Sequence, residues 1–151
     1  MAKLEFTIEI AAPVERVAAF FVPQRMPYWY GSDMQAGLEV QGGAADFQVG
    51  QKVRITGRIA RREVSLTAVI TRLEWPSVLE WQFRDPYGIR GLQSWTLEST
   101  GAGTHVTMRD AYELPGRGRL AGFLDALLMK RGVTRRDRSW LARLKQIGEA
   151  K

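Results

Sequence analysis

Apolar and polar residues alternate from the start of the chain. The stretch "LEFTIEI" predicts a strand with one apolar face, formed by Leu4, Phe6, Ile8 and Ile10. "AAPVERVAAFF" then predicts a helix, because Pro13 suits a first-turn position and Glu15 favours the positive end of the helix dipole. Pro23 and Pro27 end this helix, so the following "YWY" is expected in a short second helix or a loop.

Strand patterns continue from residue 36 to residue 113. The successive segments are "VRITGRIA", "EVSLTAVITRL", "LEWQF", "IRGLQSWTLE" and "THVTMRDAYEL". Their connections are short, which favours an antiparallel meander over parallel βαβ units. Arg54, Arg58, Arg109 and the single histidine, His105, fall on the parity opposite to the apolar residues and are expected to face solvent.

A helical pattern follows Pro115 and lasts almost to the end of the chain. It carries two apolar stripes, Leu120, Phe123, Leu124, Leu127 and Leu128 in the first half and Val133, Trp140, Leu144 and Ile147 in the second. The stripes are displaced by roughly 200° at 100° per residue. A straight helix cannot bury both against one surface, so the pattern predicts a bend or break near Gly132. Alternatively, the first stripe faces another molecule or a different part of the sheet.

This order of elements resembles the START-like superfamily, also called SRPBCC or helix-grip, and especially its polyketide cyclase/dehydrase branch. The resemblance rests on "IEIAAPVERVAAFF", "VITRLEWPSVLEWQF", "SWTLESTGAGTHVTM" and "RSWLARLKQIGE". It implies an α+β fold in which a curved antiparallel sheet of about six or seven strands wraps a long C-terminal helix, with two short helices after the first strand. It also implies a cavity between sheet and helix for a lipid, a polyketide or another aromatic molecule. The superfamily has no shared catalytic motif, so no active site is carried over.

The last predicted hairpin supplies a candidate polar anchor for such a cavity. If its turn pairs Leu97 with Val106, then Gln93 lies opposite Asp110 on the inward face. Buried polar groups cost about 1–3 kcal/mol when unpaired, so these two side chains should bond to each other, to water or to a ligand. Burial would also raise the pKa of Asp110. The alternative is an internal pair with no role in binding, or a residue near solvent at the end of a strand.

Aromatic and apolar residues complete the predicted ligand site. Tyr28, Trp29 and Tyr30 suit the rim of a pocket, since Tyr and Trp combine an apolar body with a polar tip; alternatively, Trp29 caps the core and both tyrosines lie on the surface. Trp75 is expected in a turn between strands. The remaining predicted lining residues are Leu66, Ala68, Trp81, Trp95, Met108, Tyr112, Leu124 and Leu128.

Length, composition and glycine spacing limit the classes of function that the chain can have. The 151 residues suit one domain, residues 1–151, and no apolar run approaches the ~20 residues needed to cross a bilayer. The N-terminus lacks the pattern of a secretion signal, so a cytoplasmic location is expected. With no cysteine and one histidine, neither a metal site nor a cofactor is expected. The stretch "GRGRLAG" at 116–122 has the wrong glycine spacing for a dinucleotide site and is interpreted as a gate or hinge.

Charge is concentrated at the C-terminal end. The net charge is +6, and residues 115–151 carry ten Lys or Arg against three Asp or Glu. The simplest interpretation is the solvated face of a long helix. Peripheral contact with an anionic membrane through Arg135, Arg136 and Arg138 is the alternative; nucleic acid is not expected, and a homodimer is left open.

These features favour a non-catalytic protein that binds a small, mostly apolar ligand. The alternative is an enzyme of the polyketide cyclase or aromatase type, in which Asp110 and a pocket tyrosine would move protons. The third hypothesis is an interaction protein that docks through its basic C-terminal segment.

Overall fold

The computed structural model describes residues 2–59, 61–114 and 120–150, and for residues 120–128 it describes the backbone alone. One antiparallel sheet contains seven strands in the order β1-β7-β6-β5-β4-β3-β2. The strands are β1 (Ala2–Ile10), β2 (Gly37–Val40), β3 (Lys52–Ile59), β4 (Arg62–Glu74), β5 (Val78–Arg84), β6 (Arg90–Ser99) and β7 (Thr104–Glu113). The predicted meander is confirmed, and its first strand returns to pair with the last.

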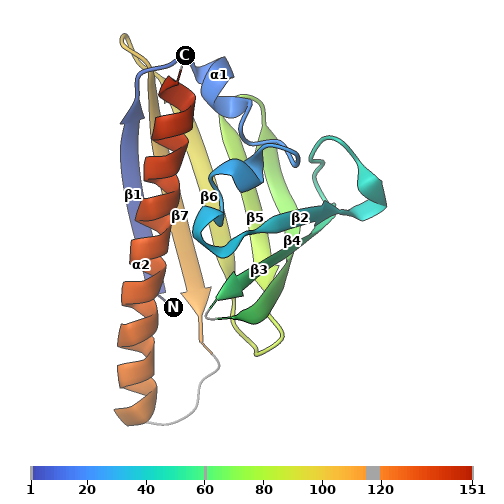
Figure 1. The fold of residues 1–151 in the computed structure, drawn as a ribbon, viewed down its shortest axis with the longest axis vertical. Helices are drawn as coiled ribbons and strands as arrows, with labels where there is room; N and C mark the ends of the chain where they lie inside the picture. The colour runs from blue at the N-terminus through green and yellow to red at the C-terminus, as the bar shows by residue number, and fades with distance from the viewer. Residues whose placement is uncertain (1, 60, 115–119, 151) are drawn as a thin grey trace.

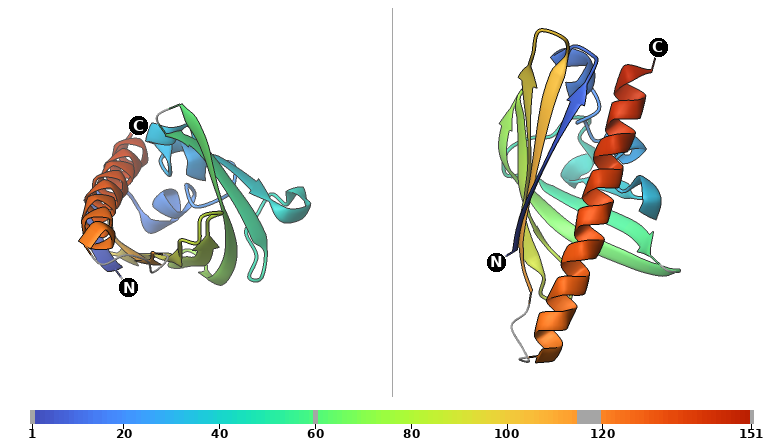
Figure 2. Two further views of the ribbon diagram at one scale, coloured as in Figure 1. Left: turned by 90° about the horizontal axis from the view of Figure 1, so that it is seen from below. Right: turned by 90° about the vertical axis from the view of Figure 1, so that its left-hand side faces the viewer.

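The long C-terminal helix and the short helices that follow β1 lie on the concave side of this sheet. After β1 come the short helix α1 (Val14–Ala18) and the single-turn helices η1 (Met26–Tyr28) and η2 (Ser32–Met34). A further single turn, η3 (Gln41–Gly43), follows β2, and the long helix α2 (Leu120–Glu149) ends the fold. Figure 1 shows α2 running beside β1, and Figure 2 shows the sheet curving around a central space, with α2 on one side and the short helices on another.

Strand positions follow the alternation in the sequence. In β1, accessible side chains alternate with partly or fully buried ones along the whole strand. In the β6–β7 hairpin, Gln93 pairs with Asp110 and Leu97 with Val106, which confirms the predicted register. Arg54, Arg58 and Arg109 are exposed, and His105 forms an ion pair with Glu9 on the outer face.

An aromatic cluster fills the core at one end of the space. Trp29, Trp81 and Trp95 are fully buried, with ring centroids of Trp81 and Trp95 5.0 Å apart and those of Trp29 and Trp95 6.0 Å apart. The Trp29 indole N–H donates a hydrogen bond to the Phe20 carbonyl oxygen at 2.8 Å. Edge-to-face contacts of this kind add to the free energy gained from apolar burial, and they fix the rings in place.

The predicted bend near Gly132 is wrong. Helix α2 is continuous over 30 residues, and its second half buries Trp140, Leu141 and Leu144. One glycine costs a helix only about 1 kcal/mol relative to alanine, which is too little to break a helix held by such burial. The predicted gate at 116–122 begins outside the described residues, and only the backbone of 120–122 is described.

Candidate functional site

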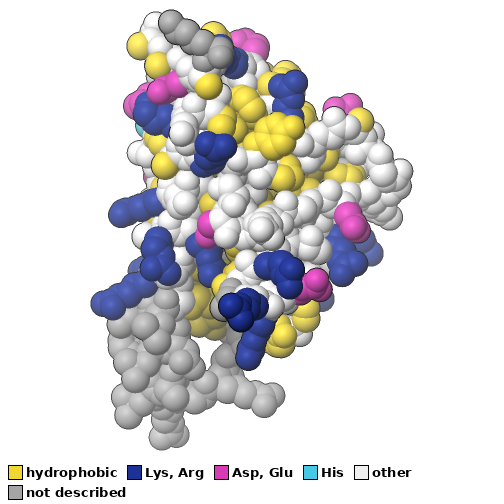
Figure 3. Space-filling view, viewed as in Figure 1, with side chains coloured by type: hydrophobic (Ala, Val, Ile, Leu, Met, Phe, Trp, Pro, Cys, Tyr) yellow, Lys and Arg dark blue, Asp and Glu magenta, His cyan; other side chains and the backbone are white. Residues whose placement is uncertain are grey.

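A cavity of about 290 Å³ lies between the sheet and α2. Strands β3 and β4 supply apolar walls through Ile55 and Leu66, and β5 adds Phe83. Helix α2 supplies Met129, Val133 and Trp140, while Met34 from η2 closes another side. Figure 3 shows apolar side chains in a hollow beside the helix, with Lys and Arg side chains around it. The cavity is therefore mostly apolar and opens toward a basic surface.

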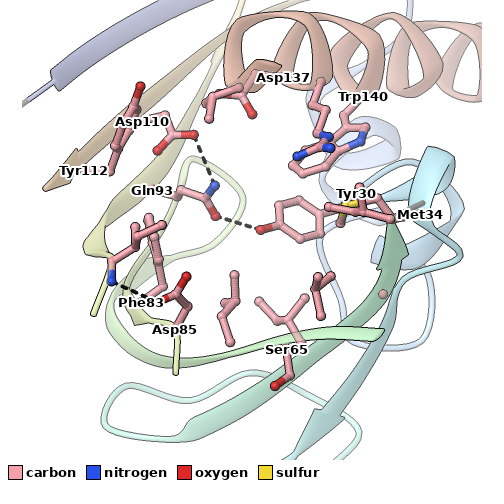
Figure 4. Close-up of a pocket in the computed structure, with 18 of the residues that line it drawn as sticks. Tyr30, Met34, Ser65, Phe83, Asp85, Gln93, Asp110, Tyr112, Asp137 and Trp140 are labelled. Carbon is pink, nitrogen blue, oxygen red and sulfur yellow. Dashed lines mark hydrogen bonds between the residues drawn. The ribbon is translucent and has the colours of Figure 1, made fainter. Parts of the chain in front are cut away.

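One end of the cavity is polar and centres on Gln93 of β6 (Figure 4). The Gln93 Oε1 atom accepts hydrogen bonds from the Trp81 indole N–H at 2.9 Å and from the Tyr30 hydroxyl at 2.8 Å. An indole nitrogen only donates, so it must face the amide oxygen of Gln93 and not the amide nitrogen. The Gln93 amide nitrogen therefore points the other way, and it donates to Asp110 Oδ2 at 3.3 Å.

A second carboxyl group faces Asp110 from the helix. Asp137 of α2 is 1% exposed and Asp110 of β7 is 3% exposed, and the two carboxyl groups are near enough for each to shift the pKa of the other. Oδ1 of Asp110, Oδ2 of Asp137 and the Tyr112 hydroxyl have no hydrogen-bond partner in the described part of the chain. The sheet and the helix thus bring two acidic side chains together at the polar end of the cavity.

Burial makes a fully ionised pair unfavourable. Loss of solvation and, next, the neighbouring charge of Asp110 together raise the pKa of Asp137 to about 10, while Arg136 opposes the shift. Burial also raises the pKa of Asp110, but its hydrogen bonds from Asp137 and Gln93 act in the opposite direction. We therefore assign the proton to Asp137 and the negative charge to Asp110, which accepts hydrogen bonds from both neighbours.

Aromatic side chains hold the helix against this end of the cavity. The Trp140 ring lies 4.6 Å from the Tyr30 ring, measured between centroids. The Trp140 indole N–H donates to Asp33 Oδ1 at 2.6 Å, and Arg136 Nε lies 3.9 Å from Asp33 Oδ2. Burial raises the pKa of Tyr30 well above its ordinary value, and the carboxyl groups of Asp110 and Asp137 raise it further, so this phenol stays a hydrogen-bond donor.

The structure brings together only some of the residues predicted for the site. Those that line the cavity are Tyr30, Leu66, Gln93, Asp110 and Tyr112. Trp29, Ala68, Trp81, Trp95 and Met108 are fully buried in the core instead of lining the cavity, because neighbouring side chains pack over them. Tyr28 is 58% exposed and outside the cavity lining. The side chains of Leu124 and Leu128 lie outside the described residues.

Sequence reasoning missed Asp137 and Trp140 as cavity residues. The signal was present, because Val133, Asp137, Trp140 and Leu144 recur at helical spacing on one face of α2. An acidic residue inside an apolar stripe is unusual, since a buried charge needs a partner. Asp137 could therefore have been paired with the inward-facing Asp110.

Two further features of the described residues bear on membrane insertion and metal binding. No helix in them is long and apolar enough to span a bilayer. No group of three or more His, Cys, Asp or Glu side chains in residues 2–59, 61–114 and 129–150 is placed to hold a metal ion. The geometry of the site is thus that of an apolar cavity with a hydrogen-bonded acidic end.

Comparisons with solved structures place this fold among known ones. A protein from Arthrobacter aurescens is 19% identical and matches over 97% of this chain and 85% of that chain, with a TM-score of 0.74. A protein from Rhizobium leguminosarum is 16% identical over 99% of this chain and 95% of that chain, with a TM-score of 0.72. DynU16, from the dynemicin biosynthetic locus, is 19% identical over 95% of this chain and 46% of its own, with a TM-score of 0.66. Identities this low show a shared fold alone.

Comparison at the level of sequence identifies the family. No curated protein sequence gives a significant match. The family model described as "Polyketide cyclase / dehydrase and lipid transport" matches residues 1–149. This match covers nearly the whole chain and agrees with the helix-grip arrangement of its sheet and helix. The chain therefore belongs to the polyketide cyclase/dehydrase and lipid transport family.

Proposed function

We propose that this protein binds a small, mostly apolar molecule in the cavity between its sheet and α2. The observation that carries the proposal is the cavity of about 290 Å³, which has apolar walls and a polar cluster at one end. Ligand pockets commonly measure about 300–1,000 Å³ and combine apolar linings with a few placed polar groups. The cavity is at the lower limit of this range, which suits a molecule of two or three rings or a short acyl chain.

The polar end would orient the ligand. Tyr112 and one carboxyl oxygen on each of Asp110 and Asp137 lack partners in the described part of the chain, although all three side chains are buried. Buried polar atoms without partners lose about 1–3 kcal/mol each, so a ligand that bonds to them is favoured over one that does not. Affinity would come mainly from apolar contact, and orientation from these atoms.

Titration with N-phenyl-1-naphthylamine tests the proposal, because this apolar dye fluoresces strongly on leaving water. We expect saturable one-site binding to the wild-type protein. Val64 lines the cavity, so Val64→Trp should fill part of it and weaken binding by about tenfold or more. Thr67→Trp is the matched control, because Thr67 lies on the same strand but is exposed. Absence of saturable binding, or equal weakening by both variants, would contradict the proposal.

The paired carboxyl groups favour one alternative, an enzyme of the cyclase or aromatase type. An ionised Asp110 beside a protonated Asp137 offers a base and an acid within one cavity. Asp110 would accept a proton from the carbon between two carbonyl groups of a polyketide. That carbon would attack another carbonyl group, and Asp137 would protonate the resulting alkoxide as the new carbon–carbon bond forms.

Turnover of a linear poly-β-ketone thioester would distinguish the two functions. In the enzyme, Asp110→Asn should abolish cyclisation but leave binding of N-phenyl-1-naphthylamine in place. In a binding protein, neither the wild type nor the variant converts the thioester faster than buffer does. Product analysis by mass spectrometry and NMR measures this directly.

A further inference from the structure

We propose that the preferred ligand carries a protonated amine at its polar end, seated against the carboxyl groups of Asp110 and Asp137. This inference rests on the proposed binding function and names the chemistry of the ligand. It arises from the geometry of the acidic pair, which brings β7 and α2 together at the polar end of an apolar cavity. An ammonium group supplies both hydrogen-bond donors and a compensating positive charge at this point.

The acidic pair has hydrogen-bond acceptors without donors. Oδ1 of Asp110 and Oδ2 of Asp137 have no donor from the described part of the protein, and the one proton between the two carboxyl groups cannot satisfy all four oxygens. Gln93 cannot turn to help, because its amide oxygen is held by the Trp81 indole and its amide nitrogen already donates to Asp110. The open positions are acceptors, so the matching ligand group is a donor.

The acidic pair also carries negative charge that no ion pair neutralises within the described residues. Arg136 is the one Lys or Arg side chain among them that lines the cavity, and its Nε atom lies 3.9 Å from Asp33. Arg136 lowers the pKa of Asp137 but forms no ion pair with Asp137 or Asp110. Hydrogen bonds between oppositely charged groups are about twice as strong as those between neutral groups. An ammonium group gains this advantage over a hydroxyl, whereas a carboxylate ligand would meet like charge.

The charge of the acidic pair is opposite in sign to the net charge of the whole molecule. The net charge of +6 repels a cation at long range, and Lys and Arg side chains surround the hollow in Figure 3. General electrostatics therefore favours an anionic ligand at the surface, and only the acidic pair favours an amine. A preference for an amine would consequently report on Asp110 and Asp137.

Three probes with the same ring system test the inference by isothermal titration calorimetry at pH 7. They are 1-naphthylmethylamine, which is protonated, 1-naphthylmethanol, which is neutral, and 1-naphthoate, which is anionic. We expect the amine to bind about tenfold more tightly than the alcohol, as one charge-assisted hydrogen bond predicts. We expect the naphthoate to bind most weakly.

The double variant Asp110→Asn/Asp137→Asn removes both carboxyl groups, and with them the negative charge of the pair, and keeps side chains of nearly the same size. It should lose the preference for the amine while still binding the alcohol, which shows that the cavity is intact. Each single variant leaves one carboxyl group, so a reduced preference should remain. Glu39→Gln is the control, because it also removes one negative charge, but at an exposed position outside the cavity.

A measurement without substitutions covers the case in which the double variant does not fold. Adding 1-naphthylmethylamine to wild-type protein labelled with ¹³C should shift the side-chain carboxyl signals of Asp110 and Asp137, and the alcohol should shift them less. The inference is overturned if the naphthoate binds most tightly, if the alcohol equals the amine, or if the carboxyl signals do not respond. The proposed function would survive those results, but it fails if none of the three probes binds.

Discussion

Gln93 holds the buried polar cluster together through three hydrogen bonds. Its amide accepts from Tyr30 and Trp81 and donates to Asp110, so it connects the segment after η1, two strands and the acidic pair. Each partner is buried, and none of these bonds can be replaced by bulk water. At this scale, the site depends on one amide whose orientation is fixed by its neighbours.

Gln93→Leu should therefore destabilise the protein strongly. It would leave the Trp81 N–H and the Tyr30 O–H without an acceptor, and we expect a loss of about 3 kcal/mol in the free energy of unfolding. Urea denaturation followed by far-UV circular dichroism measures this loss. Gln82→Leu is the control, because Gln82 is exposed on β5 and should change stability by less than about 0.5 kcal/mol. Equal effects of the two substitutions would contradict this role for Gln93.

The acidic pair makes stability depend on pH. The unfolded chain loses the Asp137 proton near pH 3.8, whereas the folded chain keeps it up to about pH 10. Unfolding releases a proton between these values, so stability should fall as the pH rises, by at most about 1.4 kcal/mol per pH unit. Denaturation between pH 5 and pH 8 should show a smaller slope for Asp137→Asn, and a higher stability than wild type at pH 8. Parallel pH profiles would show that Asp137 does not keep its proton.

Part of the buried polar cluster around Gln93 could be predicted from the sequence. The alternation in the last hairpin was sufficient to place Gln93 opposite Asp110, because parity and a short turn determine which residues pair. It did not identify Asp137 as a member of the cluster. Asp137 lies on α2 and Asp110 on β7, so their pairing depends on how α2 is rotated about its axis. Sequence reasoning assigned Trp81 and Trp95 to the cavity because inward parity is the same for core and cavity positions.

At the scale of elements, α2 defines the cavity by its position against β1 and η2. The helix contacts β1, and Trp140 and Arg136 approach Asp33 of η2. The side chains of Met129, Val133 and Asp137 thereby face the sheet across the cavity. The predicted bend at Gly132 is wrong because burial stabilises the second half of the helix by more than one glycine destabilises it. A local sequence pattern does not show how large that stabilisation is.

Gly132→Ala tests whether this helix needs flexibility. A Cβ atom at Gly132 would meet nothing within 4 Å, so alanine fits without strain. We expect the substitution to raise the free energy of unfolding by about 0.5–1 kcal/mol, since glycine is the weaker helix former. Affinity for N-phenyl-1-naphthylamine should stay the same. Lower stability, or a large loss of binding, would indicate that a bend at this position matters in solution.

At the scale of the molecule, the curved sheet encloses more space than its one long helix fills. The order of strands and helices was predictable, because each element carries its own period and the connections are short. The cavity was expected from the family resemblance, but its walls depend on where β3 and β4 lie relative to α2. No sequence pattern specifies that distance.

The basic C-terminal segment stays a separate prediction. Arg138 lies over the Phe6 ring at 5.5 Å, and Arg136 approaches Asp33, so two of its cations have neighbours within the protein. Arg135 is exposed. Binding to liposomes that contain phosphatidylserine should be weak, and it should fall with added salt if the segment docks on anionic lipid. Neutralising Arg135, Arg136 and Arg138 together would then abolish it.

The interior between β3, β4 and α2 is hollow and lined by apolar side chains. A crystal structure determined under xenon pressure tests this most directly, because xenon enters apolar cavities and scatters strongly. We expect xenon sites in contact with Ile55, Leu66 and Phe83. An interior filled by the protein's own side chains, with no xenon between the sheet and α2, would contradict the account.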